Sequence, residues 1–563
     1  MNLMLVVFAG GVLLFLGYRF YGRMLARLLG LSDANPTPAE VVNDGQDFVP
    51  TNKFYLLGQH FSAIAAAGPI VGPILAGVWF GWLPAMLWIL LGSVFIGGVH
   101  DFLALVASVR HQAKSIAEVV RLHMSPRAHF MFLIFIWICL VYLIIAFSDI
   151  TAGTFVTGAE GGGVASASML YLLIAVIMGI FIRATRFSEN RASLLFLPLV
   201  FGAIWLGGRI PIHLPGIGGL SPTVTWDWLL LAYCFIAALL PVWALLQPRG
   251  SLGGSFLYVT LLVGVIGLVG GGFRVEQPAV RPWAEMPKQL FPILFVTVAC
   301  GACSGFHAVV STGTTSKQLR KETDARLIGY GGMLLEGFVA LIALATVMML
   351  AKGSAELGQS PNQIYASGIA RFLGIFGLPH QAAFSFGLLA FATFVYDTLD
   401  VCTRLGRYIF QELTGLRGSS GKLIATAATL ALPVLTVTLQ VHDPAGNLVP
   451  VWKIFWTLFG ASNQLLAGLT LLALSVWLQR QGKPWLVTAV PMVFMMGMTL
   501  WSLVLIFQPW LQKLAGRAVQ VTAAEGVAAI VLFVLAILLL IEAAEILVRP
   551  RAPKAAMGAD TPA

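Results

Sequence analysis

Long apolar runs constrain the fold of this sequence more than any other feature. Fifteen of them are about 20 residues long, which is the length an α-helix needs to cross the hydrocarbon core of a bilayer. The chain is 58% hydrophobic and only 10% charged, so little polar surface remains for a soluble domain. We predict an all-α polytopic membrane protein with about 15 transmembrane helices near residues 3–26, 54–79, 83–109, 130–155, 168–186, 192–208, 227–246, 254–272, 290–312, 327–350, 381–403, 423–440, 454–478, 485–507 and 526–548.

The distribution of basic residues predicts the orientation of these helices. The first run has no basic residues ahead of it, and Arg19, Arg23 and Arg27 come at or after its end, which argues against a cleaved signal peptide and places the N-terminus outside. With alternating sides, 25 of the 34 Lys and Arg residues fall inside and 9 outside, and the C-terminus lies inside. The net charge of +10 then follows from this bias and from attraction to anionic lipids, without a nucleic-acid partner.

One of the apolar runs carries residues that break a helix. The segment GQHFSAIAAAGPIVGPILAG, residues 58–77, contains two Gly-Pro steps, Gly68-Pro69 and Gly72-Pro73. Proline lacks an amide donor and glycine loosens a helix, so backbone carbonyls are freed at membrane depth. Such a break is tolerated where it lines a cavity, as in transporter binding sites. The alternative interpretation is a proline-kinked packing helix.

A second interrupted run, residues 295–319, contains Gly301, Gly305 and Gly313. Each broken helix opens a stretch of seven spans, and an odd number of spans inverts the topology. Equivalent broken helices would then meet near the midplane in opposite orientation, as in inverted-repeat transporters. We expect an N-terminal helix and cytoplasmic connection over 1–42, a first repeat over 43–272, a second repeat over 273–548 and a cytoplasmic tail over 549–563.

Acidic residues within the apolar runs are candidates for ion coupling, because a charge inside a bilayer is expensive and usually faces a polar cavity. On the predicted boundaries no Lys or Arg lies in the middle of a span, so we expect these acids to lack fixed basic partners. The acids are Asp101, Asp149, Glu336, Asp397, Asp400 and Glu542. Asp397 and Asp400 share a helix face, where they either bind a cation or pair with Arg404 and Arg407.

Histidine next to a buried acid suggests a proton relay, because imidazole titrates near neutrality. His100 precedes Asp101, but successive helix residues point about 100° apart, so we do not expect their side chains to face each other. The histidines show no HxH or HxxxH spacing, and we predict no metal site. We assign ion coupling to His100, Asp101, Asp149, Asp397 and Asp400.

Substrate binding is predicted at the two broken helices. Without a mid-membrane arginine, an anionic substrate would be held by half-helix N-termini, whose free amides and positive dipole end attract carboxylates. A peptide is the alternative substrate, because its amine could meet a buried acid. The predicted substrate-binding residues are His60, Gly68, Pro69, Gly72, Pro73, Ser304, Gly305, His307, Ser311, Thr312 and Asn463.

The connection ahead of the first broken helix, NDGQDFVPTNK, is a candidate gate. Asn-Asp-Gly favours a tight turn, and Pro50 ends any preceding helix. We predict a gating role for Asn43, Asp44 and Asp47 through pairing with basic residues such as Arg320 or Arg404. The alternative is that this loop only caps the helix that follows.

Nothing in the sequence indicates an enzyme or a cofactor. The five cysteines lie in or at the edges of spans and are interpreted as small packing residues, and no Walker-type phosphate loop occurs. The expected partners are a small-molecule substrate, a coupling cation (H+ or Na+) and the lipid bilayer. A passive channel and a membrane-embedded enzyme are the alternatives to a secondary transporter.

Seven motifs occur in order between residue 43 and about residue 480. They are NDGQDFVPTNK, QHFSAIAAAGPIVGP, VHDF, LPVWALLQPRG, CGACSGFHAVVSTGTTSKQL, DTLDVCTRLGRYI and LFGASNQLLAG. Together they resemble the carbon starvation protein A (CstA) family. The resemblance implies a bacterial inner-membrane importer of peptides or pyruvate-like monocarboxylates, with the amino acid–polyamine–organocation fold of inverted repeats and two broken helices. Two departures are Gln59, where many relatives have a second histidine, and SLGG after PRG, where relatives often carry Asp-Tyr-Leu.

Overall fold

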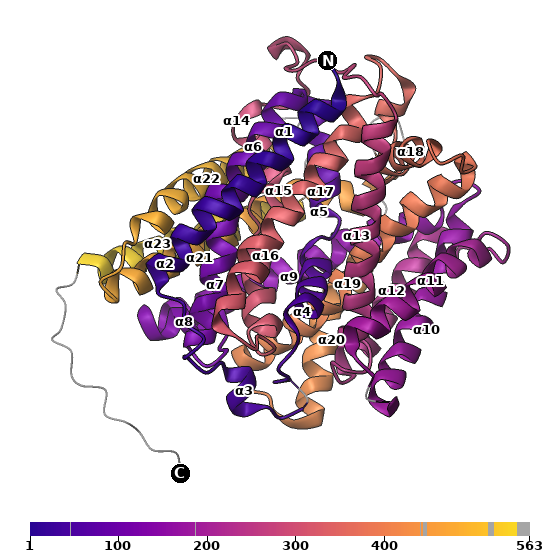
Figure 1. Cartoon of the computed structure of the whole chain (residues 1–563). Coiled ribbons are helices and arrows are strands. Elements are labelled where there is room, and N and C mark those ends of the chain that lie inside the picture. The colour runs from indigo at the N-terminus through magenta and orange to yellow at the C-terminus, as the bar shows by residue number, and fades with distance from the viewer. Residues whose placement is uncertain (46, 186, 440, 443–447, 516–522, 549–563) are drawn as a thin grey trace.

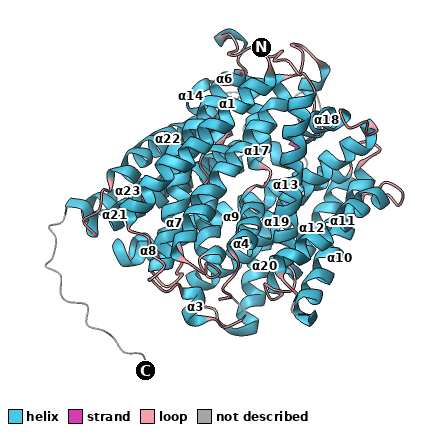
Figure 2. Cartoon of the chain, viewed as in Figure 1, coloured by secondary structure: helices cyan, strands magenta, loops and turns pink. Residues whose placement is uncertain are grey.

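The computed structural model describes the chain except for residues 46, 186, 440, 443–447, 516–522 and 549–563 (Figure 1). Helices form most of the described part, and its regular strands are the short antiparallel pair β1 (Val441–His442) and β2 (Leu448–Val449) (Figure 2). Thirteen described helical segments are long and apolar enough to cross a membrane, or 14 when the bent pair α4 and α5 counts as one span. The predicted all-α membrane architecture is confirmed, and the predicted tail over 549–563 lies outside the described residues.

The helices follow the predicted runs in order. Their bounds are α1 (Leu3–Leu16), η1 (Gly17–Tyr21), α2 (Gly22–Leu29), α3 (Pro38–Val42), α4 (Lys53–Ile64), α5 (Gly68–Phe80), α6 (Trp82–Gly92), η2 (Ser93–Gly97), α7 (Gly98–Arg110), α8 (Ile116–His123), α9 (Pro126–Phe155), α10 (Gly161–Thr185), α11 (Glu189–Gly207), α12 (Pro222–Leu239), α13 (Leu246–Gly270), α14 (Leu290–Thr297), α15 (Ala299–Ala302), α16 (Gly305–Val310), η4 (Ser311–Thr315), η6 (Arg326–Tyr330), α17 (Gly331–Met348), α18 (Pro361–Gly374), α19 (His380–Thr414), α20 (Gly418–Thr436), α21 (Val451–Arg480), α22 (Leu486–Leu514) and α23 (Ala523–Val548).

Two long helices, α9 and α19, pack against each other within the bundle. α9 also contacts α12 and α21, and α19 contacts α20 and α13. The hairpin of α10 and α11 lies at one side of the bundle, and α22 and α23 lie at the opposite side (Figure 1). The broken helices therefore lie among the helices between these two flanks.

Both predicted helix breaks are present. α4 ends at Ile64 and α5 begins at Gly68, with a 47° bend between them. Pro69 lies in the first turn of α5, where a backbone amide would have no partner within the helix, so its missing donor costs no hydrogen bond. Pro73 lies inside α5. The second run is divided into α14, α15, α16 and η4, none long enough to span a bilayer alone. The predicted count of about 15 spans includes both broken runs, and fewer segments qualify as single continuous spans because these two runs are interrupted.

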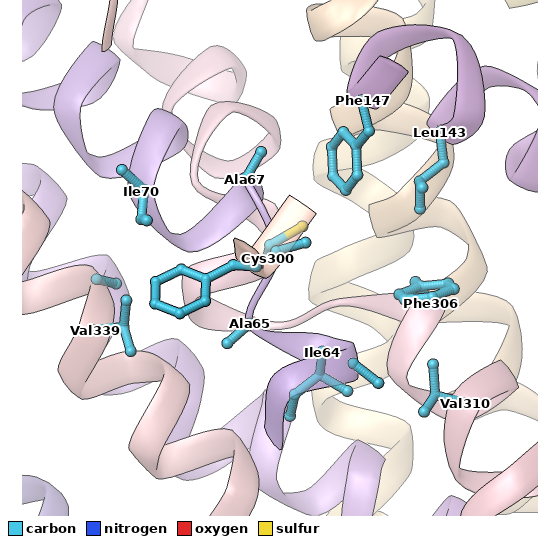
Figure 3. Close-up of a cluster of buried hydrophobic side chains, with 14 of the residues drawn as sticks. Ile64, Ala65, Ala67, Ile70, Leu143, Phe147, Cys300, Phe306, Val310 and Val339 are labelled. Atoms are coloured by element: carbon cyan, nitrogen blue, oxygen red, sulfur yellow. The ribbon is translucent and has the colours of Figure 1, made fainter. Parts of the chain in front are cut away.

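The two breaks meet each other inside the bundle (Figure 3). The break residues Ala65 and Ala67 lie close to Cys300 in this view, and the short helix α15 packs against α5. A Cβ atom on Gly68 would lie 2.3 Å from Cys300 Sγ, and one on Gly72 would lie 2.4 Å from the carbonyl oxygen of Thr297. These two glycines, predicted to bind substrate, allow the broken helices to approach each other closely.

The close approach of Gly72 to the Thr297 carbonyl predicts that a larger residue at this position lowers the stability of the protein. Replacing Gly72 by alanine forces a methyl group against the Thr297 carbonyl, and we expect the free energy of unfolding to fall by about 1–3 kcal/mol. Gly202→Ala in α11 is the matched control, because nothing lies within 4 Å of the added Cβ. Unfolding midpoints of the two variants in detergent check the prediction, and equal midpoints would contradict it.

Candidate functional site

Arg249, in the first turn of α13, is a charged residue within the described bundle. The structure begins α13 at Leu246, eight residues before the predicted span, so Gln247 and Arg249 enter the bundle. The Arg249 side chain is fully buried. The predicted boundaries left Arg249 outside the span, because the polar stretch QPRGS hid the start of the helix.

Arg249 binds both Asp397 and Asp400 of α19. Its Nε is 2.6 Å from Asp397 Oδ1, and Nη1 and Nη2 are each 2.7 Å from the two oxygens of Asp400. Nη2 also donates to the main-chain carbonyl of Asp397 at 3.1 Å. The basic partner of both acids is thus Arg249 and not Arg404 or Arg407, the pairing that the sequence offered as the alternative to a bound cation. Those two arginines instead donate to carbonyls of Ala237, Ala238 and Leu240.

Polar side chains from three other helices support this arginine–carboxylate cluster. Tyr233 of α12 donates to Asp400 Oδ2 at 3.1 Å and accepts from Arg249, and Tyr171 of α10 donates to the Arg249 carbonyl at 2.8 Å. Ser62, two residues before the first break, donates to Asp397. A Cβ atom on Gly253 would lie 2.2 Å from Asp397 Oδ2, so the cluster leaves no room for a side chain there.

Charge balance gives this cluster a specific chemical property. It contains one guanidinium and two carboxylates in a region without solvent exposure. Uncompensated charge in a low-dielectric interior is costly, so the cluster is neutral only when one carboxylate carries a proton. The arrangement can therefore take up one proton, or one cation, per Arg249.

A second buried cluster joins α7, α16 and α17. His307 Nδ1 is 2.7 Å from Asp101 Oδ2, and His307 Nε2 is 3.0 Å from Glu336 Oε2. His100 Nδ1 is 2.6 Å from Asp101 Oδ1, so the expectation that these neighbours do not face each other was wrong. The short aspartate side chain reaches the ring of the preceding residue although their Cβ atoms diverge. All four side chains are fully buried.

His60 and a small cavity lie at the first broken helix. His60 Nδ1 is 2.9 Å from Thr315 Oγ1 of the second broken run, and His60 Nε2 has no hydrogen-bond partner among the described residues. A cavity of about 10 Å³ is lined by His60, Arg249, Asp397 and Thr315, among others. This volume holds about one water molecule. The cavity places groups from both broken runs beside the arginine–carboxylate cluster.

The other predicted substrate residues bind one another or the backbone. Asn463 of α21 accepts from the Phe306 amide at 2.9 Å and exchanges hydrogen bonds with Ser304, so it caps α16 at Gly305. The α16 half-helix N-terminus is therefore already occupied by a side chain. Thr312 accepts from the amide of Ile116, while the buried hydroxyl of Ser311 has no partner among the described residues.

Asp149, predicted to couple ions, caps a helix instead of joining either cluster. Its Oδ2 accepts from the Trp452 amide at 2.8 Å, in the first turn of α21. Asp227 of α12 lies nearby, is fully buried and was missed from the sequence. It lies five residues inside its helix, and its position inside an apolar run was the signal available to find it.

The candidate gate connects the two broken runs. Asp44 Oδ1 accepts from the amides of Asp47 and Phe48, which closes the turn predicted from Asn43 onward. The strand-like segment that follows bonds to the end of the second run: the Val49 amide donates to Lys317 and the Thr51 amide to Gln318. The pairing predicted for Asp44 and Asp47 with Arg320 or Arg404 stays a prediction.

One group of side chains, drawn from α8, α9 and α19, has the composition of a metal site. The ligand atoms of Glu118, His129 and Glu412 lie within 4.8 Å of one another. Burial raises the pKa of the Glu118 carboxyl, but hydrogen bonds from Arg121 and the charges of Arg121, Lys114 and His129 lower it more, so the pKa lies below its usual range. Cationic side chains already balance this group, so it gives no reason to add a metal.

Comparison with known proteins identifies the chain's relatives. The peptide transporter CstA of Helicobacter pylori is 34% identical, over 90% of this chain and 82% of the relative. The pyruvate/proton symporter BtsT of Escherichia coli is 32% identical, over 88% and 81%. Among solved structures, a manganese transporter of Eremococcus coleocola matches at 13% identity and a TM-score of 0.48, covering 90% of this chain and 99% of that one.

The family assignment rests on the sequence matches. The model of the family described as carbon starvation protein CstA matches residues 2–364 and 354–502, which together cover most of the chain. The relatives in that family carry transporter names, and the helical bundle described above has the spans such a protein needs. The chain belongs to the carbon starvation protein CstA family of membrane transporters, as its motifs predicted.

Proposed function

We propose that this chain is a proton-coupled symporter that imports a small organic carboxylate, with Arg249 binding the substrate carboxylate. The observation that carries the proposal is a fully buried guanidinium that lines a cavity between the broken helices and is shared by two carboxylates. Guanidinium is the side chain best suited to bind a carboxylate through two parallel hydrogen bonds. Peptides and pyruvate, which the names of the CstA and BtsT relatives give as their substrates, both present a carboxylate.

The charge balance supplies a coupling mechanism. A substrate carboxylate that binds Arg249 competes with Asp397 or Asp400 for the same donors. The displaced carboxylate would remain buried without a cation unless it takes up a proton, so substrate and proton bind together more favourably than either alone. Asp397 is the acid we assign to this step, because it also contacts Ser62 at the first break and lines the cavity. One proton would accompany each substrate carboxylate.

The second cluster is proposed as the proton path. His307 joins Asp101 to Glu336. His60 lines the cavity, interacts electrostatically with Asp101 and His307, and has one ring nitrogen without a hydrogen-bond partner among the described residues. Histidine exchanges protons near neutral pH and bridges carboxylates through its two ring nitrogens. His100 would hold the Asp101 carboxylate in place.

The packing supports the proposed repeats. α4 packs on α13 as α16 packs on α21, and α9 packs on α12 as α19 packs on α20. Between the two repeats, α9 packs on α21 as α19 packs on α13. These pairs match the helices of 43–272 to those of 273–548 in order, leaving the flanking hairpins α10–α11 and α22–α23 outside the correspondence. We further place the protein in the bacterial inner membrane with a periplasmic N-terminus and a cytoplasmic C-terminus, from the basic-residue bias.

Uptake into proteoliposomes tests the proposed function. With an inward proton gradient, we expect radiolabelled pyruvate or a labelled dipeptide to accumulate, and the accumulation to collapse when an uncoupler is added. A sodium gradient at equal pH should drive no accumulation. Accumulation driven by sodium alone, uptake that equilibrates without accumulating, or no transport of either carboxylate would contradict the proposal. Pyruvate alone would identify a monocarboxylate importer, and the dipeptide alone a peptide importer.

A further inference from the structure

An apolar groove runs along the outer surface of the bundle between α1, α13 and α17. Its volume is about 890 Å³, and its walls include Phe8, Val12, Phe15, Val269, Leu335 and Phe338. The groove is lined from Met4 on α1 to Tyr18 on η1, which corresponds to about 21 Å of helix. This exceeds the roughly 15 Å thickness of one leaflet of the hydrocarbon core. The groove is therefore long enough to hold an acyl chain along its length.

A basic pocket of about 520 Å³ adjoins the groove where Tyr18 and Leu327 line both. Its other residues include Arg23, Arg27, Lys53 and Arg326, opposed by Asp324 alone among the acids that line it. Lys53 Nζ is 3.7 Å from Asp324 Oδ1, and the Arg326 guanidinium lies 5.1 Å from the centre of the Tyr18 ring. In the described part of the chain, Arg23, Arg27 and Arg326 form no ion pair. Three arginine side chains of the pocket thus have no anionic partner among the described residues, because its one acid pairs with Lys53.

We infer that this groove and pocket together form a binding site for one anionic phospholipid. The acyl chain lies between α1 and α17, and the phosphate is held by Arg23, Arg27 and Arg326. The apolar groove excludes a free anion as the whole ligand, and the uncompensated arginines favour an anionic over a zwitterionic headgroup. The pocket lies on the predicted cytoplasmic side, where Arg23 and Arg27 follow the first span. The site is separate from the arginine–carboxylate cluster and does not rest on the proposed function.

Native mass spectrometry of the intact protein, titrated with phosphatidylglycerol or phosphatidylcholine of identical chains, tests the inference. We expect the protein to bind one phosphatidylglycerol tightly and to bind phosphatidylcholine with at least tenfold lower affinity. The triple variant Arg23→Gln, Arg27→Gln, Arg326→Gln should bind phosphatidylglycerol roughly 100-fold more weakly, because each surface cation contributes about fivefold. The control Arg417→Gln, Lys422→Gln removes charges near the start of α20 and should change the affinity less than twofold.

The groove has its own matched pair of variants, which do not disturb the charges. Val12 lines the groove and is 39% exposed, whereas its neighbour Leu13 is 52% exposed and does not line it. Val12→Trp should fill the groove and weaken phosphatidylglycerol binding at least tenfold, and Leu13→Trp should not. Equal binding of the two lipids, full binding by the triple variant, or no difference between the tryptophan variants would overturn the inference. The inference would also be overturned if inorganic phosphate stabilised the protein as much as phosphatidylglycerol does. A dimer that forms through this face in the absence of lipid would overturn it too.

Discussion

Replacing Arg249 by glutamine is expected to abolish proton-driven substrate accumulation and to destabilise the protein. The change leaves Asp397 and Asp400 buried without their cation, and losing one partner of a buried ion pair costs about 3–5 kcal/mol. Arg249→Lys retains the charge but lacks the planar fork that reaches both acids, so we expect better folding with little uptake. Accumulation in proteoliposomes and the unfolding midpoint in detergent measure the two effects.

A structural role for Arg249 can be separated from a substrate-binding role. Adding Asp400→Asn to Arg249→Gln lowers the unpaired buried charge, so the double variant should regain much of the lost stability but no uptake. Arg407→Gln is the matched control, because Arg407 is also buried but donates to the Ala238 carbonyl. Uptake by the stable double variant would show that Arg249 only holds the fold, and loss of uptake in the folded control would show that any buried arginine has the same effect.

The transmembrane architecture could be predicted from the sequence because the bilayer thickness dictates the length of an apolar helix. The predicted span 130–155 and the observed α9, Pro126–Phe155, end at the same residue. Helix ends that run into polar sequence could not be predicted this way. α19 continues to Thr414 beyond the predicted end at 403, and α13 begins at Leu246 instead of 254. Hydropathy does not detect a helix whose polar turn is covered by other helices.

The candidate site shows the same limit. The free-energy cost of a charged side chain inside a bilayer singles out Asp101, Asp397 and Asp400 from the sequence alone, because acids are rare in apolar runs and usually functional there. The partners of these acids depend on how helices far apart in the chain pack, and Arg249 is 148 residues from Asp397. The available signal was the arginine within the motif LPVWALLQPRG, which the family resemblance already included. The site roles of all these residues remain predictions.

Asp397→Asn is expected to uncouple transport from the proton gradient while leaving a folded protein. Asparagine imitates the protonated carboxyl group permanently, and Arg249 keeps a compensating charge in Asp400. We expect proton-driven accumulation to fall at least tenfold, whereas exchange of labelled for unlabelled substrate continues at a rate within about threefold of the unaltered protein. The exchange rate should also lose its dependence on pH, because the group that titrates during transport is absent.

Asp227→Asn is the matched control for this uncoupling, because it makes the same chemical change at another fully buried acid outside the arginine–carboxylate cluster. It should retain both accumulation and the pH dependence of exchange. Full accumulation by Asp397→Asn would move the coupling step to the second buried cluster, Asp101, His307 and Glu336. Loss of exchange together with accumulation would instead mean that Asp397 is needed to position Arg249 for the substrate, because the Nε of that arginine would have lost its carboxylate.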